Sequence, residues 1–485
     1  MKNENISSDI KAEHGCACMR KINEVLLINP VLVENLPPRN ISFGIAYIAQ
    51  QLMSYGYGVE ILDVDTHRYD KKEVLERIEK SSCDIIGIGS LVTAYSYLSW
   101  LIPAIKDLKP DIKIVLGGGI ATAIPERCLV RFDIDYAVIG EGEVTIIELL
   151  KTLNENRSVK DVAGIAFRDN DEVIFTVPRP HMPSLDDVPA LNTALFPVEK
   201  ILNNSKGVFA IHAQRGCPWR CTFCFNCFRT SETSRVRYRP VKNVVDEIES
   251  LHKRLPIKYF YLSGECVVVN KRWILAFCKE LIERKLKIKY RVTSRLDTLD
   301  EERLKWLSQS GCEILSFGLE SGSPKILKIM KKNINLEKAK QILKLAQKYI
   351  PTIEVSIMYG YIGETEETIK ETTTYCKELN ILPAYFFATA YPGTELWDMA
   401  IEQGHIKDEE EAMMNLSSIT DFNINLTKMT DEEILRLQKE SKREMQMHYF
   451  LRNPFVLPEK FFGLLKNKRL KTRYAKNQNL FSSKS

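Results

Sequence analysis

Four of the twelve cysteines crowd into one short stretch, from Cys217 to Cys227. The segment from Met1 to Met19 is polar and has no apolar run, so we expect no export signal and thiols that stay reduced. A cluster of reduced thiols indicates metal or redox chemistry instead of disulfides. Cys217, Cys221 and Cys224 are spaced C-x3-C-x2-C. Three thiolates can hold three irons of a cubane [4Fe-4S] cluster and leave the fourth open to a substrate or cofactor, which predicts catalysis.

Two other metal sites compete with this interpretation. Cys221, Cys224 and Cys227 also form the C-x2-C-x2-C run of bacterial ferredoxins, but that run needs a fourth cysteine where the chain has Ser231. A tetrahedral zinc site needs a second ligand pair, and no C-x2-C or H-x3-H pair follows at zinc-finger spacing. Both alternatives are disfavoured. Six further cysteines are isolated in apolar segments and are expected to pack in cores: Cys83, Cys128, Cys266, Cys278, Cys312 and Cys376.

The cysteine motif comes soon after a predicted strand, Val208 to His212, which opens an alternation of strands and helices. Six β/α units before about Pro392 predict an incomplete barrel, whose active site lies at the carboxyl ends of the strands. The other five strands are expected at Tyr259 to Leu262, Lys289 to Thr293, Ile314 to Gly318, Val355 to Tyr359 and Tyr385 to Ala390.

A similar alternation runs from Glu24 to about Leu153 and predicts a doubly wound parallel sheet. In such sheets ligands bind beyond the carboxyl ends of the strands, where small residues let a large flat ligand approach the backbone. The strands are expected at Val25 to Asn29, Val59 to Asp63, Ile85 to Gly89, Ile112 to Leu116 and Tyr136 to Ile139. The candidate ligand-binding residues at their ends are Ser90, Leu91, Gly117, Gly118, Gly119, Gly140, Glu141 and Gly142.

The cysteine spacing, with Phe223 just before the last cysteine, resembles the signature of the radical S-adenosylmethionine superfamily. The resemblance implies that Cys217, Cys221 and Cys224 ligate a [4Fe-4S] cluster, whose open iron chelates the methionine moiety of S-adenosylmethionine. It further implies reductive cleavage to a 5′-deoxyadenosyl radical, with electrons from a donor such as flavodoxin or ferredoxin. The protein's part is to position these groups and to exclude water.

Residues at other predicted strand ends resemble the cofactor-binding elements of that superfamily. Ser263-Gly264-Glu265 resembles the Gly-Gly-Glu element that receives the ammonium group, with Ser263 in place of the first glycine. Ser294-Arg295 and Glu320 resemble the residues that hold the carboxylate and the ribose. The stretch from Tyr359 to Thr365 resembles a Gly-x-x-Gly-Glu-Thr turn against the adenine, with departures at Tyr361 and Ile362.

The first α/β region resembles the cobalamin-binding domain of cobalamin-dependent members of this superfamily. The resemblance rests on Pro37-Pro38-Arg39, Phe43 to Tyr47, Gly117 to Gly119 with Pro125-Glu126, and Gly140 to Glu143. The D-x-H-x-x-G signature is missing, because Asp65-Thr66-His67 is followed by Asp70 in place of glycine. Either no histidine binds the lower face of the cobalt, or the domain has lost cobalamin. Phosphate-binding motifs of nucleotide sites are absent, and flavin stays open as a ligand.

Both cofactors together allow methyl transfer to an unactivated carbon, which the resemblance implies as the commoner activity. Ring formation or oxidative rearrangement, as in the anaerobic magnesium-protoporphyrin ester cyclases, is the alternative, and a non-catalytic iron-sulfur or cobalamin sensor is a third. Aromatic and basic residues alternate between Phe455 and Leu480. This pattern fits peripheral contact with the inner membrane face and an apolar, natural-product, lipid or tetrapyrrole substrate, and it fits equally a solvated helix packed on its own domain.

Length and composition predict a globular protein of two or three domains, which we expect in the cytoplasm. A net charge of +5 over 485 residues favours no nucleic-acid partner, and no apolar run predicts a transmembrane segment. The expected segments are a disordered leader (1–20), a cobalamin-binding domain (21–157), a hairpin and linker (158–203), a radical S-adenosylmethionine barrel (204–415), and a helical C-terminal region with a basic amphipathic tail (416–485).

Overall fold

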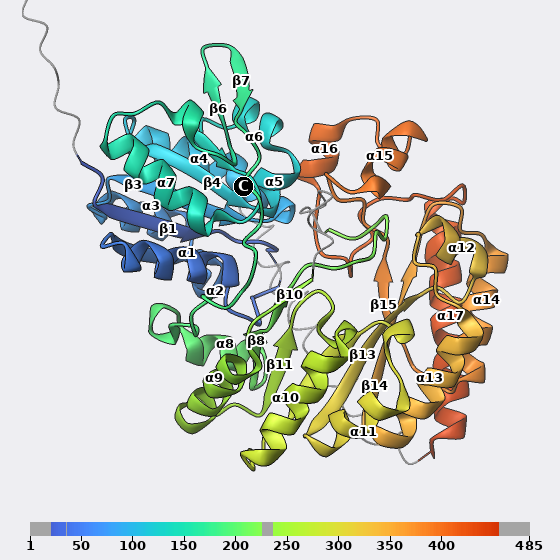
Figure 1. Cartoon of the computed structure of the whole chain (residues 1–485). Helices are drawn as coiled ribbons and strands as arrows, with labels where there is room; N and C mark the ends of the chain where they lie inside the picture. Colours follow the sequence, from blue (N-terminus) through green and yellow to red (C-terminus); the bar gives the residue numbers. More distant parts are fainter. Residues whose placement is uncertain (1–20, 35, 226–235, 455–485) are drawn as a thin grey trace, which may run out of the picture.

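The computed structural model describes residues 21–34, 36–225 and 236–454 of the chain. It contains two main sheets, each covered by helices, and a helical C-terminal region (Figure 1). The first sheet, blue to cyan, lies at the upper left of the figure, and the second, green to orange, lies below and to the right. The α/β class is confirmed as a doubly wound sheet followed by a partial barrel and C-terminal helices.

The first sheet has the strand order β2-β1-β3-β4-β5-β6-β7, and β1 to β5 run parallel. The order reverses between β1 and β3, which is where doubly wound sheets bind ligands outside the carboxyl ends. Strand β1 is buried from Val25 to Asn29, as expected where helices cover both faces. The strands are β1 (Glu24–Asn29), β2 (Gly58–Asp63), β3 (Ile85–Ser90), β4 (Lys113–Gly118), β5 (Tyr136–Val138), β6 (Ile165–Asp169) and β7 (Glu172–Phe175).

Capping side chains start several helices of this part. Asp63 accepts from Thr66 N–H, and Asp70 accepts from Glu73 N–H at 2.9 Å. Each such cap stabilises its helix by about 1 kcal/mol. The helices are α1 (Phe43–Ser54), α2 (Val64–His67), α3 (Lys71–Lys80), α4 (Tyr95–Leu108), α5 (Gly119–Ala123), α6 (Pro125–Arg131), α7 (Gly142–Asn154) and, after the linker, α8 (Val198–Asn204).

A β-hairpin, β6 and β7, extends the first sheet by antiparallel pairing on β5. The edge of the sheet is therefore mixed: the alternation that predicted parallel strands ends near Leu153, and the hairpin lies in the later segment (158–203) where the sequence led us to expect one. The reason is local: a two-residue turn can join antiparallel strands only. Asn170 turns the chain in the left-handed conformation (φ 56°), which asparagine tolerates well.

The second sheet has the order β15-β14-β13-β12-β11-β8, with every neighbouring pair parallel. Within the described residues β8 and β15 do not pair, so the barrel is open. Each of the six predicted strands is present. They are β8 (Val208–His212), β11 (Tyr259–Ser263), β12 (Tyr290–Ser294), β13 (Cys312–Glu320), β14 (Thr352–Tyr359) and β15 (Ala384–Phe387), with helices α9 (Val241–Arg254), α10 (Lys271–Glu283), α11 (Glu301–Gln309), α12 (Pro324–Ile329), α13 (Leu336–Tyr349) and α14 (Glu366–Glu378) between them.

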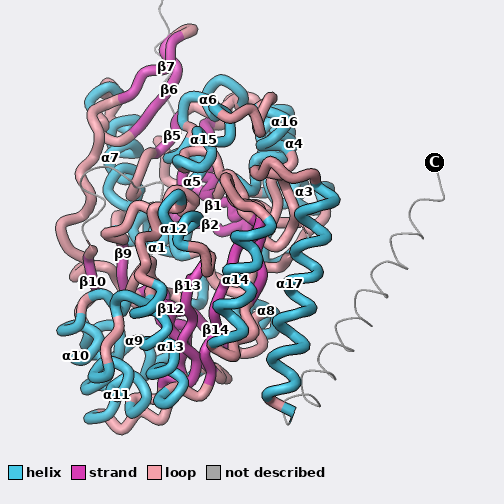
Figure 2. Tube along the Cα trace, turned by 90° about the vertical axis from the view of Figure 1, so that its right-hand side faces the viewer, coloured by secondary structure: helices cyan, strands magenta, loops and turns pink. Residues whose placement is uncertain are grey.

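A short antiparallel ladder of β9 (Gln214–Arg215) and β10 (Arg237–Tyr238) flanks the cysteine motif. The C-terminal region contains α15 (Glu395–Glu402), α16 (Glu409–Met414) and α17 (Asp431–Arg452). Figure 2 shows α17 running beside α14. Among the described residues, no helix is both long and apolar enough to cross a bilayer. The predicted leader and the basic tail lie outside the described residues.

The two α/β parts share apolar core. One buried cluster contains Ile120 and Leu129 from the first part together with Tyr361, Leu396 and Trp397 from the barrel part. Interiors of this kind pack as densely as organic crystals, so a shared core holds the two parts at a fixed separation.

Candidate active site

The three motif cysteines lie on the loop that follows β8 and β9, at the carboxyl end of the barrel sheet. Cys217 and Cys224 are half-buried and Cys221 is buried. Among the described residues, no three His, Cys, Asp or Glu side chains converge so as to hold one metal ion. A cubane takes each thiolate on a different iron, so its three ligands need not converge on one point. Cys227 and Ser231, on which the ferredoxin register depends, lie outside the described residues.

Thr222 fixes the cysteine loop to three other elements. Its N–H donates to Met330 O at 3.1 Å, and its carbonyl accepts from Leu396 N–H at 2.9 Å. Its hydroxyl is hydrogen-bonded to the hydroxyl of Tyr361, one of the two departures from the family pattern. A buried hydroxyl pair of this kind holds the loop without contributing a cluster ligand.

Gly264 and Glu265 follow β11 beside the cysteine loop. A Cβ at Gly264 would lie 2.6 Å from Gln214 Oε1, so this strand end needs glycine for its close approach. Glu265 Oε2 accepts from Gly216 N–H at 3.1 Å, immediately before Cys217. Burial raises the pKa of the Glu265 carboxyl. A cationic ligand such as an ammonium group would therefore be favourable beside it.

Arg295, which follows Ser294 at the end of β12, places its cation beside the cysteine motif. Its Nη1 donates to Cys221 Sγ at 3.7 Å, and its guanidinium lies 4.3 Å from the centroid of the Trp219 ring. Asp297 accepts from Nε and Nη2 at 2.9 and 2.8 Å, which fixes the orientation of the group. The Ser294 hydroxyl donates to Arg295 O at 3.0 Å.

Glu320 ends β13 at an irregular register and has the left-handed conformation (φ 67°). Such backbone strain costs energy and concentrates at functional sites. Lys332 Nζ donates to Glu320 Oε1 at 2.9 Å, and both residues are buried. Lys332 also lies over the Phe223 ring, and its carbonyl accepts from Arg295 Nη2 at 2.7 Å. No sequence pattern indicates Lys332, because only the fold brings this lysine to Glu320 and Phe223.

A buried carboxyl holds the turn between β14 and α14. Glu364 Oε2 accepts from Gly360 N–H at 2.6 Å. Burial raises the pKa of Glu364 to about 8. Gly360 and Gly363 have left-handed backbone (φ 79° and 82°), which accounts for both glycines of this element.

The glycines at the carboxyl edge of the first sheet differ in their surroundings. A Cβ at Gly140 would meet no atom within 4 Å. A Cβ at Gly118 would lie 2.5 Å from Ser90 O, and one at Gly119 would lie 2.6 Å from the Phe225 ring. Open space at this edge therefore lies at Gly140, whereas the protein's own packing requires Gly118 and Gly119.

The rest of this edge offers a small apolar surface. Ser90 is buried and donates to Leu91 O at 3.2 Å, whereas Leu91 is 42% exposed. A Cβ at Gly117 would approach no atom closer than 4.0 Å, whereas one at Gly142 would be crowded by Ile48 at 3.2 Å, so the open backbone beside Leu91 is at Gly117. An exposed leucine beside uncrowded backbone suits the face of a large flat ligand.

The Asp65-Thr66-His67 stretch supports a loop of the fold. Asp65 Oδ1 accepts from Leu32 N–H at 3.1 Å, and Arg68 donates to carbonyls of the same loop after β1. His67 stacks on Tyr69 with ring centroids 4.8 Å apart, and burial lowers its pKa.

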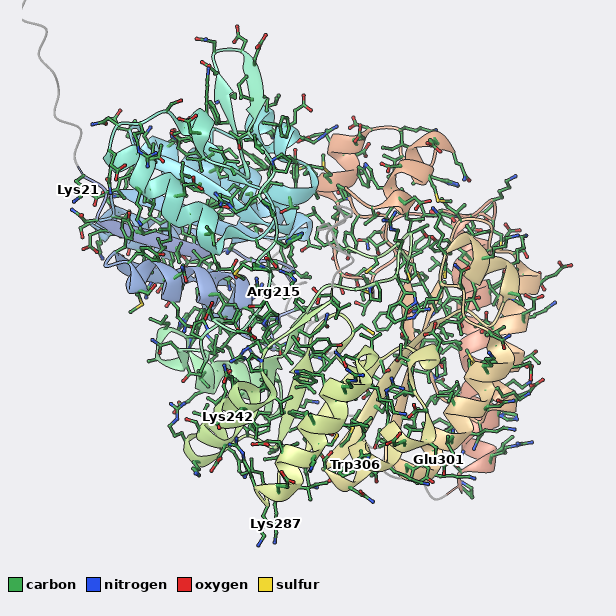
Figure 3. The ribbon with its side chains drawn as sticks, in the orientation of Figure 1. Lys21, Arg215, Lys242, Lys287, Glu301 and Trp306 are labelled. Atoms are coloured by element: carbon green, nitrogen blue, oxygen red, sulfur yellow. The ribbon has the colours of Figure 1, made fainter. Side chains whose placement is uncertain are left out.

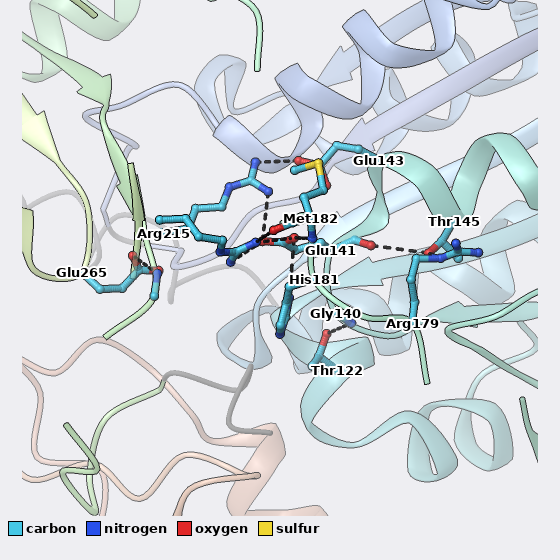
Figure 4. A network of polar contacts seen from close by, with 12 residues as sticks. Thr122, Gly140, Glu141, Glu143, Thr145, Arg179, His181, Met182, Arg215 and Glu265 are labelled. Atoms are coloured by element: carbon cyan, nitrogen blue, oxygen red, sulfur yellow. Dashed lines mark hydrogen bonds and ion pairs between the residues drawn. The ribbon is translucent and has the colours of Figure 1, made fainter. Parts of the chain in front are cut away.

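The Glu141 side chain is bound by residues of the barrel part (Figure 4). Arg237 donates to both carboxylate oxygens, and Arg215 Nη1 lies 3.3 Å away. Burial alone would raise the pKa of Glu141, but hydrogen bonds from His181 and Arg237 and the charge of Arg215 hold it well below its ordinary value. Because Arg215 and Arg237 already bind the Glu141 carboxylate, only the backbone of Glu141 is free to contact a ligand. No sequence pattern indicates a role for Arg215 or Arg237 here, because a two-residue ladder leaves no periodic signal.

The cysteine loop touches the edge of the first sheet. Phe225, directly after Cys224, lies against Gly119, and its ring centroid is 5.7 Å from that of Tyr391. The donor set of three thiols with a nearby cation fits an iron-sulfur cluster that binds S-adenosylmethionine. The uncrowded edge at Gly140 and Leu91 fits a corrin.

Comparison with known families assigns both parts of the chain. The model of the radical SAM superfamily matches residues 211–376, and that of the B12 binding domain matches residues 30–150. This chain belongs to the cobalamin-dependent radical S-adenosylmethionine enzymes. For this radical S-adenosylmethionine enzyme, the superfamily implies a [4Fe-4S] cluster and S-adenosylmethionine as cofactors, and the B12 binding domain implies cobalamin.

Solved structures share the fold of this radical S-adenosylmethionine enzyme. The radical S-adenosylmethionine methyltransferase TsrM from Kitasatospora setae has a TM-score of 0.66 at 21% identity, over 79% of this chain and 77% of that chain. The cobalamin-dependent S-adenosylmethionine radical enzyme OxsB has a TM-score of 0.63 at 21% identity, over 87% of this chain and 62% of that chain.

Relatives of the radical S-adenosylmethionine enzyme include two that align over nearly its whole length. An uncharacterized methyltransferase of Pyrococcus horikoshii is 29% identical, covering 91% of this chain and 95% of the relative. Cytidylyl-2-hydroxyethylphosphonate methyltransferase of Streptomyces wedmorensis is 27% identical, covering 90% and 92%. The anaerobic magnesium-protoporphyrin IX monomethyl ester cyclase of Rubrivivax gelatinosus is 28% identical, covering 76% and 67%.

Proposed function

We propose that this enzyme transfers a methyl group from S-adenosylmethionine to an unactivated carbon of an apolar or natural-product substrate. The observation that carries the proposal is the contact of Phe225, beside Cys224, with Gly119. This contact brings the cysteine loop next to the carboxyl edge of the first sheet, at Leu91, Gly119 and Gly140, which we call the cobalamin edge. A reaction that uses both cofactors on one substrate requires such closeness. The two relatives that align over nearly the whole chain, both named methyltransferases, support it.

In this proposal the barrel residues hold the cluster and orient S-adenosylmethionine. Cys217, Cys221 and Cys224 are the cluster ligands. The bound cluster and S-adenosylmethionine supply the one-electron chemistry, with electrons from a flavodoxin-like or ferredoxin-like donor. Other residues bind by complementary charge or by hydrogen bonds: Glu265 with Gly264 receives the ammonium group, Arg295 the carboxylate and Glu320 the ribose hydroxyls.

The first sheet would carry cobalamin at its carboxyl edge. Gly140 opens the space, and Leu91 offers an apolar contact. The His67 imidazole is stacked on Tyr69 in the loop-supporting stretch, so we propose that no histidine binds the lower face of the cobalt. Neighbouring members of this edge are Ser90, Gly117, Gly118, Gly119, Glu141 and Gly142.

Product analysis tests the proposal. Anaerobically reconstituted, cobalamin-loaded protein should release both 5′-deoxyadenosine and S-adenosylhomocysteine on reduction. One molecule of S-adenosylmethionine would be cleaved to 5′-deoxyadenosine and methionine, and a second, after giving up its methyl group, would leave S-adenosylhomocysteine. Cys221→Ala should abolish both products, and Cys83→Ala, a change at a buried thiol outside the motif, should abolish neither. Liquid chromatography with mass detection measures both compounds.

A labelling experiment addresses the substrate, and the product analysis above addresses the alternative reaction. With methyl-deuterated S-adenosylmethionine and a cell extract, the label should appear in the organic-soluble fraction if the substrate is apolar. The ring-forming alternative is supported by the similarity to the cyclase relative. It predicts 5′-deoxyadenosine without S-adenosylhomocysteine, and that result would replace our proposal.

A further inference from the structure

Arg215 and Arg237 reach from the barrel part to the cobalamin-binding part at one point, Glu141. Figure 4 labels Arg215 and Glu141 there. Arg215 on β9 and Arg237 on β10 are directly opposite in the antiparallel ladder, so their side chains leave the same face. Glu141 and Glu143, at the start of α7, face them. In Figure 3, Arg215 lies where the two parts meet, whereas Lys287 lies at the far end of the barrel.

The pairing of Arg237 with Glu141 is bidentate. Its Nη1 and Nη2 donate to the two carboxylate oxygens at 2.9 and 2.8 Å. Its Nη1 also donates to Met182 O at 2.8 Å, and Met182 N–H donates to Glu141 at 3.0 Å. Arg215 lies 3.3 Å from Glu141 and 2.5 Å from Glu143. Charge-assisted bonds in this geometry fix orientation as well as distance.

On one side these ion pairs adjoin the cobalamin edge. Glu141 directly follows Gly140, the residue with open space around it. The Gly140 N–H donates to Thr122 Oγ1 at 3.0 Å, and that hydroxyl donates to Gly118 O at 2.9 Å. The Glu141 carboxylate is therefore continuous with the backbone that would contact a corrin.

On the other side the ion pairs adjoin the S-adenosylmethionine end of the barrel. Arg215 directly precedes Gly216, whose N–H donates to Glu265 at 3.1 Å. Cys217, the first proposed cluster ligand, follows Gly216. A displacement of Arg215 would therefore shift a cluster ligand and the hydrogen bond that orients Glu265.

The ion pairs are poorly explained as adhesion alone. The shared apolar core already joins the two parts, and it contains residues from both, such as Ile120 and Trp397. A buried ion pair often adds no net stability over apolar residues of similar size, whereas it can fix one arrangement. The charges of the two arginines and the two glutamates also cancel, so this group of ion pairs keeps one geometry without a net buried charge.

We propose that Arg215 and Arg237 are positioning residues that hold the Gly140-Glu141 loop in register with Gly216 and Glu265, so that cobalamin and S-adenosylmethionine each raise the affinity of the protein for the other. The inference rests on the proposed function, because it needs both cofactors. It adds a coupling between their sites. The coupling path is the continuous set of contacts from Gly118 through Glu141 and Arg215 to Glu265.

Paired binding measurements test the coupling. Cluster-loaded enzyme is dialysed anaerobically against labelled S-adenosylmethionine with and without saturating hydroxocobalamin, and the ratio of the two Kd values is the coupling factor. We expect a wild-type factor between about fivefold and 150-fold, the usual range for coupled sites. Arg237→Gln and Glu141→Gln keep the size of each side chain but break the bidentate pair. Both should bring the factor close to one while each cofactor still binds.

Two further variants separate coupling from general damage. Glu143→Gln weakens one contact of Arg215 only, so it should fold even if the other variants do not, and it should lower the factor partway. Arg284→Gln is the matched control, because Arg284 pairs with Asp246 and Glu280 within the barrel part. Its factor should equal that of the wild type. The reverse titration, with hydroxocobalamin as the varied ligand, must return the same factor.

The outcomes distinguish this inference from the proposed function. A wild type that forms no S-adenosylhomocysteine contradicts the proposed function but leaves the coupling open to measurement, whereas a wild type that binds no cobalamin removes the basis for both. A wild type that binds both cofactors with a factor of one overturns the coupling alone. The coupling is also overturned if Arg237→Gln or Glu141→Gln folds and its coupling factor stays at the wild-type value. If neither of these variants folds, an unchanged factor in Glu143→Gln overturns it.

Discussion

Lys332 and Glu320 form a buried ion pair beside Phe223 of the cysteine motif. Glu320 itself has strained backbone, and the missing Cβ of Gly318 leaves room for both charged groups. Lys332 also accepts a hydrogen bond from Arg295 through its carbonyl. One residue therefore supports both side chains that we propose for the ribose and the carboxylate of S-adenosylmethionine.

Replacing this lysine should weaken S-adenosylmethionine binding without removing the cluster. Breaking a buried pair by deleting one partner costs about 3–5 kcal/mol, because it leaves the other charge uncompensated. If part of that cost falls on Glu320, Lys332→Met should raise the Kd for S-adenosylmethionine at least about tenfold, equivalent to about 1.4 kcal/mol. Iron content should stay near four per chain, as judged by iron assay and absorption.

The adjacent Lys331 provides the control. It pairs with Glu395 at 2.5 Å, but its side chain is 52% exposed, and surface pairs contribute at most about 1 kcal/mol. Lys331→Met should change the Kd less than about threefold. Equal effects of the two variants would mean that Lys332 acts only through net charge.

At the scale of elements, the turn after β5 decides whether the first sheet can take a corrin. Gly140 has open space and left-handed backbone (φ 81°), and so does Gly56 (φ 84°) in the turn before β2. The two turns lie at opposite ends of a parallel sheet. The same substitution at both positions therefore imposes the same kind of backbone strain, but only one fills the proposed cobalamin edge.

Gly140→Leu should abolish uptake of hydroxocobalamin, whereas Gly56→Leu should leave it unchanged. Both should lose a similar amount of stability, of order 1 kcal/mol, because a leucine in left-handed backbone is strained. Absorption of the gel-filtered complex measures the uptake, and thermal unfolding measures the strain. Loss of uptake in both variants would attribute the effect to destabilisation of the sheet.

At the scale of the whole molecule, the shared core makes the two α/β parts interdependent. Tyr361 contributes to that core and also binds Thr222 of the cysteine loop, so the loop is anchored by residues that hold the parts together. Separate domains commonly unfold in separate steps. A core that crosses the junction predicts one step instead.

Calorimetry of the full chain should therefore show one thermal transition in which the two α/β parts unfold together. Hydroxocobalamin should shift the whole transition upward, because a ligand that binds only the folded state stabilises every part that unfolds with it. Two resolved transitions, of which only one responds to hydroxocobalamin, would mean that the junction is too weak to couple the parts.

The sequence by itself determined the fold class and most strand positions. Each of the six barrel strands and the five parallel strands of the first sheet lies within a few residues of its predicted range. Runs such as Val25 to Asn29 are apolar on both faces and end in small or turn residues, so local chemistry specifies them. The cysteine spacing likewise indicated the cluster chemistry, because ligand spacing within one loop is a local property.

Only the tertiary structure decided which residues meet across the chain. Lys332 reaches Glu320 and Phe223, Thr222 reaches Tyr361, and Arg237 reaches Glu141, yet none of these pairs has a periodic or local signal in the sequence. A hairpin was expected from the sequence, but its pairing onto β5 and the β9–β10 ladder depended on contacts that spacing does not encode. The physical reason is that a buried ion pair or hydroxyl pair is stable only where packing removes water from both partners, and that condition is met by the fold as a whole.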